Sequence, residues 1–208
     1  MTHHLDASLR ALQRDPHFAP VIKKYGPAKL SRPNLKPGDI FQSLCRSIIY
    51  QQISGKAAAS ILARFRSLTP RKEFPAPKDI LSLSDVKLRS AGLSPQKTSY
   101  LKDLAQKFAD GDIRHTELDS MTSAEIVEHL TAVKGVGEWT AHMVMIFTLQ
   151  RLDILPTGDL GIRKGFQKLY GLRSMPDKVR MEKLAREWRA HASVASWYLW
   201  RLADEGKR

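Results

Sequence analysis

A glycine-punctuated turn between two apolar segments constrains the fold more than any other part of this sequence. The turn spans residues 133–137 and reads VKGVG. Before it, Thr122 and Glu125 form the T-x-x-E pattern of a capping box, and apolar residues then recur at helical spacing. After it, residues 138–150 are apolar nearly all round, which predicts a buried helix. The stretch therefore predicts two helices joined by a tight hairpin.

A hairpin of this kind can offer main-chain N–H groups to an anion. Gly135 and Gly137 permit positive φ and let another backbone approach closely. The N–H groups of residues 135–137 would then be free at the N-terminus of the second helix, where the macrodipole favours negative charge. A nucleic-acid phosphate is the obvious ligand, because such a grip does not depend on base sequence. The alternative is that the glycines only make a tight turn, and the local sequence does not separate these interpretations.

The charge of the chain also favours a polyanion as partner. The 208 residues carry a formal net charge of +13, with a sequence pI of about 10.0. Nucleic acid or an anionic membrane surface would match this excess. The sequence has no apolar run of about eighteen residues and no signal-peptide pattern, and its basic residues are scattered over many expected helices. We therefore expect nucleic acid as the partner and no membrane association.

Helical periodicity recurs along the whole chain, without β-strand alternation or an internal repeat. Besides the hairpin helices, the pattern predicts helices over residues 40–50, 56–68, 78–83, 84–91, 96–109, 160–170, 177–190 and 193–204. The predicted class is all-α. The single cysteine, Cys45, falls on the apolar face of the 40–50 helix and should lie in the core. One cysteine excludes an internal disulfide and any cysteine-built zinc or iron–sulfur site within this chain.

The hairpin and three further motifs resemble the DNA glycosylase superfamily that repairs damaged bases. Residues 130–141, LTAVKGVGEWTA, resemble its helix-hairpin-helix, and Asp159 stands in a Pro-Thr-Gly-Asp setting similar to the 3-methyladenine (alkylpurine) branch. The segments 50–54, YQQIS, and 193–200, SVASWYLW, are similar to two other motifs of that branch. Because the four motifs occur in the family's order, the resemblance covers essentially the whole chain.

The resemblance implies an architecture of two helical lobes flanking a DNA-binding cleft. One lobe would comprise about residues 38–145, and the other about residues 1–37 plus 146–208. Together they would form a single catalytic core over residues 1–208, with the hairpin on one rim of the cleft and Asp159 at its floor. Because some bacterial alkylpurine glycosylases carry an additional N-terminal β domain for which this chain is too short, we expect the catalytic core alone.

Asp159 is the predicted catalytic residue. A carboxylate can stabilise the oxocarbenium character of the sugar as an N-glycosidic bond breaks, or it can orient water. The alternative is structural, since an aspartate between Gly158 and Leu160 is also a good N-cap for the following helix. The local sequence favours the cap, whereas the position of Asp159 after Gly137 and the resemblance favour catalysis. One side chain can fill both roles.

The resemblance further implies a monofunctional glycosylase. Superfamily members that also cut the strand have a lysine two residues past the last hairpin glycine, where this chain has Trp139, which cannot form a Schiff base. We expect excision of alkylated purines such as 3-methyladenine and 7-methylguanine, which would leave an abasic site and initiate base excision repair. The rival is a non-catalytic binder of damaged or abasic DNA, and Asp159 favours the enzyme. A purely structural helix-hairpin-helix module would explain the charge but not the tryptophans.

Two segments supply the predicted DNA contacts, the hairpin and the YQQIS motif. The residues are Lys134, Gly135, Val136, Gly137, Thr140, Gln51, Gln52 and Ser54. A glycosylase extrudes its target base and fills the hole with a wedge. By position in the motif the wedge is Gln52, with Gln51 and Ser54 along the minor-groove side. The alternative is that Gln51 and Gln52 only cap the helix that ends at Tyr50.

Trp139 and Trp200 match the pocket tryptophans of the alkylpurine branch. Aromatic faces attract a cationic alkylated base through stacking and cation–π forces. Either side chain could instead be packing, since the helix of Trp139 is apolar nearly all round and Trp200 shares a helix face with Trp197.

No cofactor is expected to be required. The hairpin of the family commonly binds a monovalent cation, Na⁺ or K⁺, through main-chain carbonyls, and the matching positions are Thr131, Val133 and Val136. The expected partner is double-stranded DNA containing alkylated bases, bound by a monomer. The expected location is intracellular, in the cytoplasm of a bacterium or archaeon or in the nucleus of a eukaryote.

Overall fold

The chain folds into helices that form two compact units. The structure, a computed structural model, describes residues 2–30, 39–69, 74–113 and 116–206. Within these ranges the regular elements are all helices and no strand occurs, so the predicted all-α class is confirmed. None of the described helices is long and apolar enough to cross a membrane.

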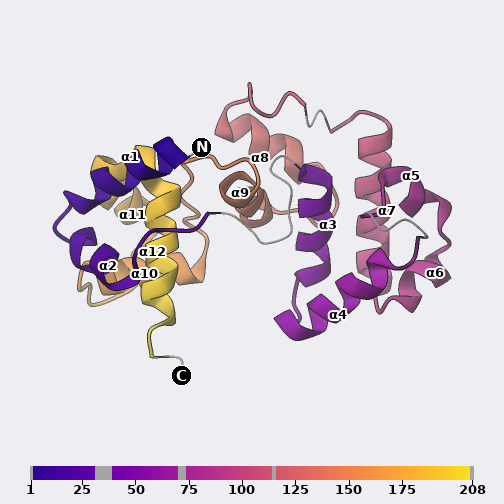
Figure 1. Cartoon of the computed structure of the whole chain (residues 1–208), viewed down its shortest axis with the longest axis horizontal. Helices are drawn as coiled ribbons and strands as arrows, with labels where there is room; N and C mark the ends of the chain where they lie inside the picture. The colour runs from indigo at the N-terminus through magenta and orange to yellow at the C-terminus, as the bar shows by residue number, and fades with distance from the viewer. Residues whose placement is uncertain (1, 31–38, 70–73, 114–115, 207–208) are drawn as a thin grey trace. The chain divides into compact units, whose positions relative to one another are not determined.

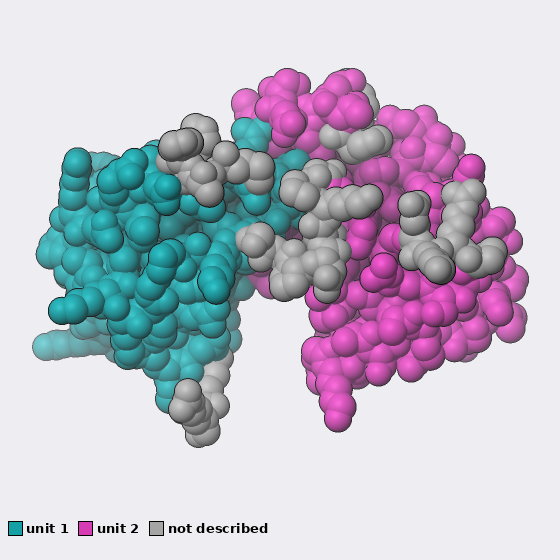
Figure 2. Space-filling model, in the orientation of Figure 1, with its two compact units in different colours: residues 1–33, 145–208 teal, residues 34–144 magenta. Residues whose placement is uncertain are grey.

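The two units divide the chain discontinuously, as the colours of Figure 2 show. Unit 1 comprises residues 1–33 and 145–208, and unit 2 comprises residues 34–144. The predicted lobe boundary near residue 37 lies outside the described residues. The later boundary falls within helix α9, Glu138–Phe147.

Unit 2 is built around helix α7, Pro95–Ala109. Ser94 caps it by accepting the Lys97 N–H at 3.2 Å, and Pro95 occupies its first turn, where a missing N–H does no harm. The other helices of the unit are α3 Ile40–Tyr50, α4 Gly55–Arg66, α5 Pro77–Ser82, α6 Asp85–Ser90, α8 Ser123–Thr131 and the start of α9. Helix α7 packs against α3, α5 and α6, and α3 also packs against α4 (Figure 1).

The core of unit 2 is apolar and tightly enclosed. Its fully buried side chains include Leu44, Ile48, Phe65, Ile80, Leu88, Leu101, Leu104, Ile126 and Leu130. Burying a side chain of this size stabilises the fold by roughly 1.5–3 kcal/mol. Cys45 is fully buried among them, as predicted, and this burial raises the pKa of its thiol well above the ordinary value.

Unit 1 is built around the last helix, α12, Ala192–Asp204, most of whose residues are buried. Around it lie α1 Thr2–Gln13, α2 Phe18–Tyr25, α10 Leu160–Leu169, α11 Lys178–Leu184 and a 3₁₀ helix, η1 Arg186–His191 (Figure 1). The α10–α12 packing is unusually close, because a Cβ at Gly165 would lie 2.4 Å from the Leu199 carbonyl oxygen. Only glycine permits this approach. The start of α10, at Asp159 and Gly161, thereby lies beside Trp200 on α12.

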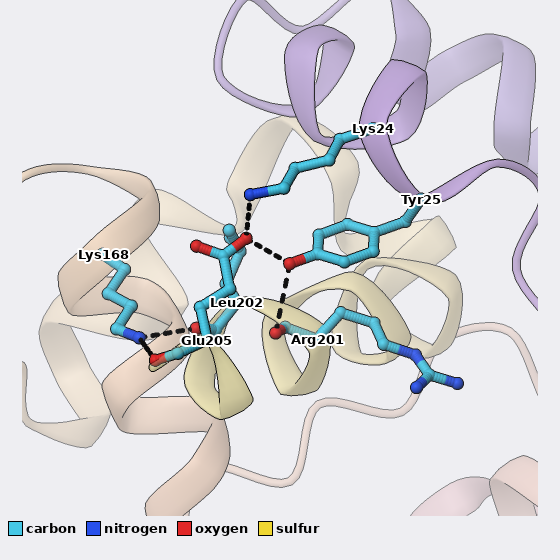
Figure 3. A network of polar contacts seen from close by, with 6 residues as sticks. All are labelled: Lys24, Tyr25, Lys168, Arg201, Leu202 and Glu205. Atoms are coloured by element: carbon cyan, nitrogen blue, oxygen red, sulfur yellow. Dashed lines mark hydrogen bonds and ion pairs between the residues drawn. The ribbon is translucent and has the colours of Figure 1, made fainter. Parts of the chain in front are cut away.

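A polar clasp holds the end of α12 (Figure 3). The Glu205 carboxylate accepts hydrogen bonds from Lys24 Nζ, at 2.6 Å, and from the Tyr25 hydroxyl on α2. Lys168 Nζ on α10 donates to the carbonyls of Leu202 and Glu205, each at 2.8 Å. These carbonyls are acceptors that a helix leaves unpaired at its C-terminus, where a cation is also favoured by the macrodipole. The clasp therefore joins α2 and α10 to the same helix end.

Two predicted helices end more than two residues earlier than expected. Helix α9 ends at Phe147 instead of residue 150, and Gln150 takes a positive φ of 56°. The helix predicted over residues 177–190 is divided at Ala185 into α11 and η1, and within η1 the φ of −118° at Trp188 is not helical. The Trp188 ring packs edge-on against Phe18, and its indole N–H donates to Tyr170 at 3.1 Å. Tertiary packing of one large side chain thus overrides the helical pattern.

Candidate catalytic and DNA-binding residues

Asp159 caps helix α10. Its φ of −77° and ψ of 125° are extended, and its Oδ1 accepts a hydrogen bond from the Ile162 N–H at 2.8 Å. The Asp159 N–H in turn donates to the Pro156 carbonyl at 3.0 Å, which closes the turn before the helix. The cap role considered for Asp159 is therefore confirmed. It is compatible with a catalytic role, because a carboxylate held in this way has a defined orientation.

A tryptophan supplies a second hydrogen bond to the same carboxylate oxygen. Trp200 Nε1 on α12 donates to Asp159 Oδ1 at 3.0 Å. The Trp200 ring also stacks on Phe147, with ring centroids 5.9 Å apart and planes 25° apart. Trp197 is buried and has Arg201 over its ring, so it is the packing member of the pair. Trp200, which is partly exposed, is the tryptophan that contacts the candidate catalytic group.

A glycine makes room for this contact. A Cβ at Gly161 would lie 2.9 Å from Asp159 Oδ1 and 2.9 Å from Trp200 Cδ1. Any side chain there would push the indole and the carboxylate apart. The Asp159–Trp200 pair therefore depends on Gly161 as well as on the close packing at Gly165.

The hairpin differs from its prediction in two details. Gly135 has a positive φ of 79°, as predicted, but Gly137 does not, and a Cβ at Gly137 would meet nothing within 4 Å. The Val136 N–H is not free either, because it donates to the Val133 carbonyl at 3.0 Å. The expectation of three free N–H groups is therefore wrong, and Gly135 and Gly137 are the residues whose amides the hairpin could offer to an anion.

Helix α7 contacts the hairpin through the Tyr100 ring and the Asp103 carboxylate. A Cβ at Gly135 would lie 2.2 Å from the Tyr100 ring, so Gly135 is required by a side chain and not by an approaching backbone. Asp103 Oδ2 accepts the Lys134 N–H at 2.9 Å, and its Oδ1 lies 3.7 Å from Lys134 Nζ. The Lys134 side chain is 69% exposed, whereas that of Asp103 is 17% exposed. Lys134 can therefore reach solvent while its main chain is fixed.

The predicted wedge loop, residues 51–54, lies between α3 and α4. Gln52 has a positive φ of 57°, an uncommon conformation for a residue with a side chain, and it is exposed. Ser54 caps α4 through Oγ, which accepts the Ala57 N–H at 3.3 Å. The Gln51 side chain does more than end α3, since its Nε2 donates to the Gly135 carbonyl at 2.8 Å. The wedge loop and the hairpin are therefore bonded to each other directly.

Two other predicted site residues, Trp139 and Thr140, differ in their exposure to solvent. Trp139 is 50% exposed, so the alternative that it belongs to the core is wrong. Thr140 is only 4% exposed, which leaves little of its side chain at the surface, and its contact with DNA stays a prediction. Trp139 belongs to unit 2, whereas Trp200 and Asp159 belong to unit 1. That both tryptophans face one base stays a prediction.

Main-chain oxygens at the hairpin have the donor type that a monovalent cation requires. Thr131 ends α8, and Val133 and Val136 follow in the turn. The Val133 carbonyl already accepts the Val136 N–H and keeps one lone pair for a cation. Across the described ranges, histidine, cysteine and carboxylate side chains form no cluster of three that could hold a metal. A cation at the three carbonyls stays a prediction.

Sequence reasoning missed the residues that hold this machinery in place. Lys97, Tyr100 and Asp103 on α7, Phe147, and Gly161 all contact predicted site residues or their segments. The spacing of the three α7 residues places them on one helix face. The sequence shows that these three residues share a helix face, but no local pattern indicates that this face contacts a hairpin about thirty residues later.

The whole chain is similar to known repair proteins. Residues 45–190 match the family described as HhH-GPD superfamily base excision DNA repair protein. A DNA-3-methyladenine glycosylase of Schizosaccharomyces pombe is 32% identical over 197 residues, which cover 93% of this chain and 86% of that protein. A putative DNA-3-methyladenine glycosylase of Bacillus subtilis is 27% identical over 208 aligned residues, covering 94% of this chain and 72% of that protein.

Solved structures agree with this assignment. A 3-methyladenine DNA glycosylase of S. pombe in complex with abasic DNA matches with a TM-score of 0.81 at 30% identity, and the match covers 98% of each chain. A DNA-3-methyladenine glycosidase of Bacillus halodurans matches with a TM-score of 0.83 at 33% identity, covering 95% of this chain and 89% of that one. The chain therefore belongs to the HhH-GPD superfamily of base excision DNA repair proteins.

Proposed function

We propose that this chain is a monofunctional DNA glycosylase that hydrolyses the N-glycosidic bond of alkylated purines in double-stranded DNA, 3-methyladenine and 7-methylguanine among them. One observation carries the proposal: the Asp159 carboxylate receives two N–H donors, from Ile162 and Trp200, beside a stacked pair of aromatic rings. The relatives named as 3-methyladenine glycosylases support the choice of substrate.

The reaction suits a fixed carboxylate. Alkylation at a purine ring nitrogen makes the base cationic, so the base leaves as a neutral molecule when the bond to C1′ breaks with its electron pair. Positive charge then develops on the sugar, and water adds to C1′ and releases a proton. Asp159 would stabilise that charge electrostatically, a kind of stabilisation that is largest where the charged group is already oriented. The two hydrogen bonds to Oδ1 supply that orientation.

Aromatic rings would retain the cationic base. In unit 1, the partly exposed Trp200 stacked on Phe147 offers a ring face next to Asp159. In unit 2, Trp139 is exposed enough to contact a ligand. A cation over a tryptophan face gains roughly 0.5–2 kcal/mol. Such rings would favour a methylated, positively charged purine over an ordinary neutral one.

The proposed enzyme leaves the DNA strand intact. Strand cleavage by the lyase route needs an amine that forms a Schiff base with the sugar. Trp139 occupies the position two residues past Gly137 where strand-cutting members of the superfamily have a lysine. The expected product is therefore an abasic site, which begins base excision repair.

Unit 2 would grip and distort the duplex. The N–H groups of Gly135 and Gly137 and the exposed ammonium of Lys134 would bind backbone phosphate, helped by the net charge of +13. Gln52, at the tip of the wedge loop, would fill the space left by the extruded base. A Na⁺ or K⁺ ion bound by the hairpin carbonyls would reinforce the grip on phosphate.

Base release from methylated DNA tests the proposal. The wild type and Asp159→Asn are compared at saturating enzyme, so that any difference in DNA affinity cannot affect the rate. Wild-type release of 3-methyladenine or 7-methylguanine is expected, with little release by the variant. Asparagine still accepts the Ile162 N–H, so thermal melting should show that the cap survives. A wild type that binds abasic DNA tightly yet frees no base would instead identify a non-catalytic damage binder.

A further inference from the structure

Three residues of α7 contact both segments that the proposed function assigns to DNA. Lys97, Tyr100 and Asp103 occur at positions i, i+3 and i+6, so they share one face of the helix. Lys97 contacts the wedge loop, residues 51–54, and the end of α3 before it. Tyr100 and Asp103 contact the hairpin, residues 133–137. Helix α7 is thus a common support for two loops that are far apart in sequence.

The Lys97 contact fixes the start of the wedge loop. Its ammonium donates to the carbonyls of Ile49 and Gln51, each at 2.8 Å. Burial lowers the pKa of Lys97, and the two carbonyls replace part of the water that its ammonium loses. Gln52 follows immediately with its positive φ of 57°. Holding the Gln51 carbonyl therefore constrains the residue pair that presents the wedge.

The contacts from Tyr100 and Asp103 fix the position of the hairpin and do not themselves attract DNA. The Tyr100 ring fills the space beside Gly135, and Asp103 accepts the Lys134 N–H at 2.9 Å. A carboxylate 3.7 Å from the Lys134 ammonium weakens the positive field that a phosphate would meet. Because Asp103 opposes phosphate binding electrostatically, its contribution must be the fixed main chain of the hairpin. The Gln51–Gly135 hydrogen bond then links the wedge loop directly to the hairpin.

We propose that Lys97, Tyr100 and Asp103 are positioning residues that couple the wedge loop to the hairpin, so that gripping phosphate and entering the base stack occur as one event. The inference rests on the proposed function for the roles of the two loops. It goes beyond that function by assigning the coupling to a helix that carries none of the predicted DNA contacts. Loss of a positioning residue should slow wedge insertion without changing the number of phosphate contacts.

The probe is a duplex that holds a tetrahydrofuran abasic analogue next to 2-aminopurine, whose fluorescence rises when the neighbouring base step is unstacked. The protein is the 208-residue chain at saturating concentration, so the rate of the fluorescence rise reports insertion and not affinity. Lys97→Met keeps the aliphatic stem and removes both hydrogen bonds. It is expected to slow the rise by at least about tenfold, because losing even one charge-assisted hydrogen bond has an effect of about that size. The probe has no cleavable base, so the test does not depend on catalysis.

Lys102→Met is the matched control. Lys102 lies on the same helix, and its ammonium pairs with Asp85 at 2.8 Å rather than with either loop. Both variants lose one positive charge, so both should lose the same affinity for undamaged DNA. Only Lys97→Met should slow the fluorescence rise. Equal rates for the two variants would overturn the coupling.

A pair of Asp103 variants decides the matter even if Lys97→Met does not fold. Asp103→Asn removes the charge but keeps an acceptor for the Lys134 N–H, so its affinity for undamaged DNA should increase at an unchanged insertion rate. Asp103→Ala removes both the charge and the acceptor, and it should insert more slowly than Asp103→Asn. If the alanine variant inserts as fast as the asparagine variant, the hairpin needs no positioning and the inference is wrong. If the wild type frees no base from methylated DNA yet shows these differences, the coupling stands and the enzymatic function fails.

Discussion

Replacing Trp200 with phenylalanine should slow base release while leaving DNA binding almost unchanged. In the wild type the Trp200 and Phe147 ring centroids are 5.9 Å apart, and phenylalanine at position 200 retains an aromatic face over Phe147. It lacks the indole N–H that donates to Asp159 Oδ1 at 3.0 Å. A hydrogen bond to a charged group contributes about 1.5–3 kcal/mol. If that contribution is needed to orient the carboxylate in the transition state, the single-turnover rate should fall by about 10- to 150-fold.

The assay separates orientation from stacking. Single-turnover release of 7-methylguanine is measured at saturating enzyme, and affinity is measured separately on a duplex with an abasic analogue. Trp200→Phe should affect the first measurement and spare the second. Trp197→Phe, a change of the same size three residues earlier on α12, serves as the control because Trp197 is buried and its ring packs beneath Arg201.

The reasoning fails if Trp200→Phe releases base at the wild-type rate. Stacking alone would then explain the tryptophan, and the indole hydrogen bond would be incidental. A fall in rate that Trp197→Phe matches would also refute it, because both variants would then be acting through the packing of α12. Melting temperatures of the two variants show whether either change has loosened that helix.

Two further predictions concern stability. Gly165→Ala should destabilise the fold by about 1–3 kcal/mol in denaturant titrations, because its Cβ would lie 2.4 Å from the Leu199 carbonyl oxygen and must force α10 away from α12; wild-type stability of this variant would contradict the close packing. Hydrogen bonds from Lys24 and Tyr25 lower the pKa of Glu205, so its contribution is present above the ordinary glutamic-acid pKa and is lost as pH falls through the lowered folded pKa. Glu205→Gln should therefore lower Tm at neutral pH, by less than about 3 °C because the group is largely exposed, and the difference from wild type should vanish in acid; a difference that persists there would exclude the charge as its cause.

Local motifs were predictable because both partners of each contact lie within one helical turn. The capping box at Thr122 and Glu125 is present, with the Glu125 N–H donating to Thr122 Oγ1 at 3.3 Å and Glu125 Oε2 accepting the Thr122 N–H at 2.7 Å. The cap at Asp159 is of the same kind. Such contacts depend on spacing alone, so a sequence pattern is sufficient to predict them.

Long-range contacts were not predictable from the same patterns. Gln51 and Gly135 are 84 residues apart, and Lys134 and Asp103 are 31 residues apart. Nothing in the sequence near Gln51 distinguishes a side chain that bonds the hairpin from one that lies along DNA. The Val136 N–H was wrongly expected to be free for a related reason. The sequence of a glycine-rich turn does not reveal which of its N–H groups form hydrogen bonds within the turn.

The orientation of Asp159 depends on two glycines of α10, Gly161 and Gly165. Gly161 and Gly165 are four residues apart, so they lie on the same face of α10. At Gly165 the absent Cβ lets the helix touch the main chain of α12, and at Gly161 it leaves room for the Trp200 ring beside the carboxylate. A Cβ at position 165 would force α10 away from α12, and a Cβ at position 161 would force the Trp200 ring and the Asp159 carboxylate to shift, so both glycines protect the 3.0 Å hydrogen bond. The chemistry assigned to one aspartate is therefore a property of the whole α10–α12 contact, which explains why the aspartate alone could be interpreted as an ordinary helix cap.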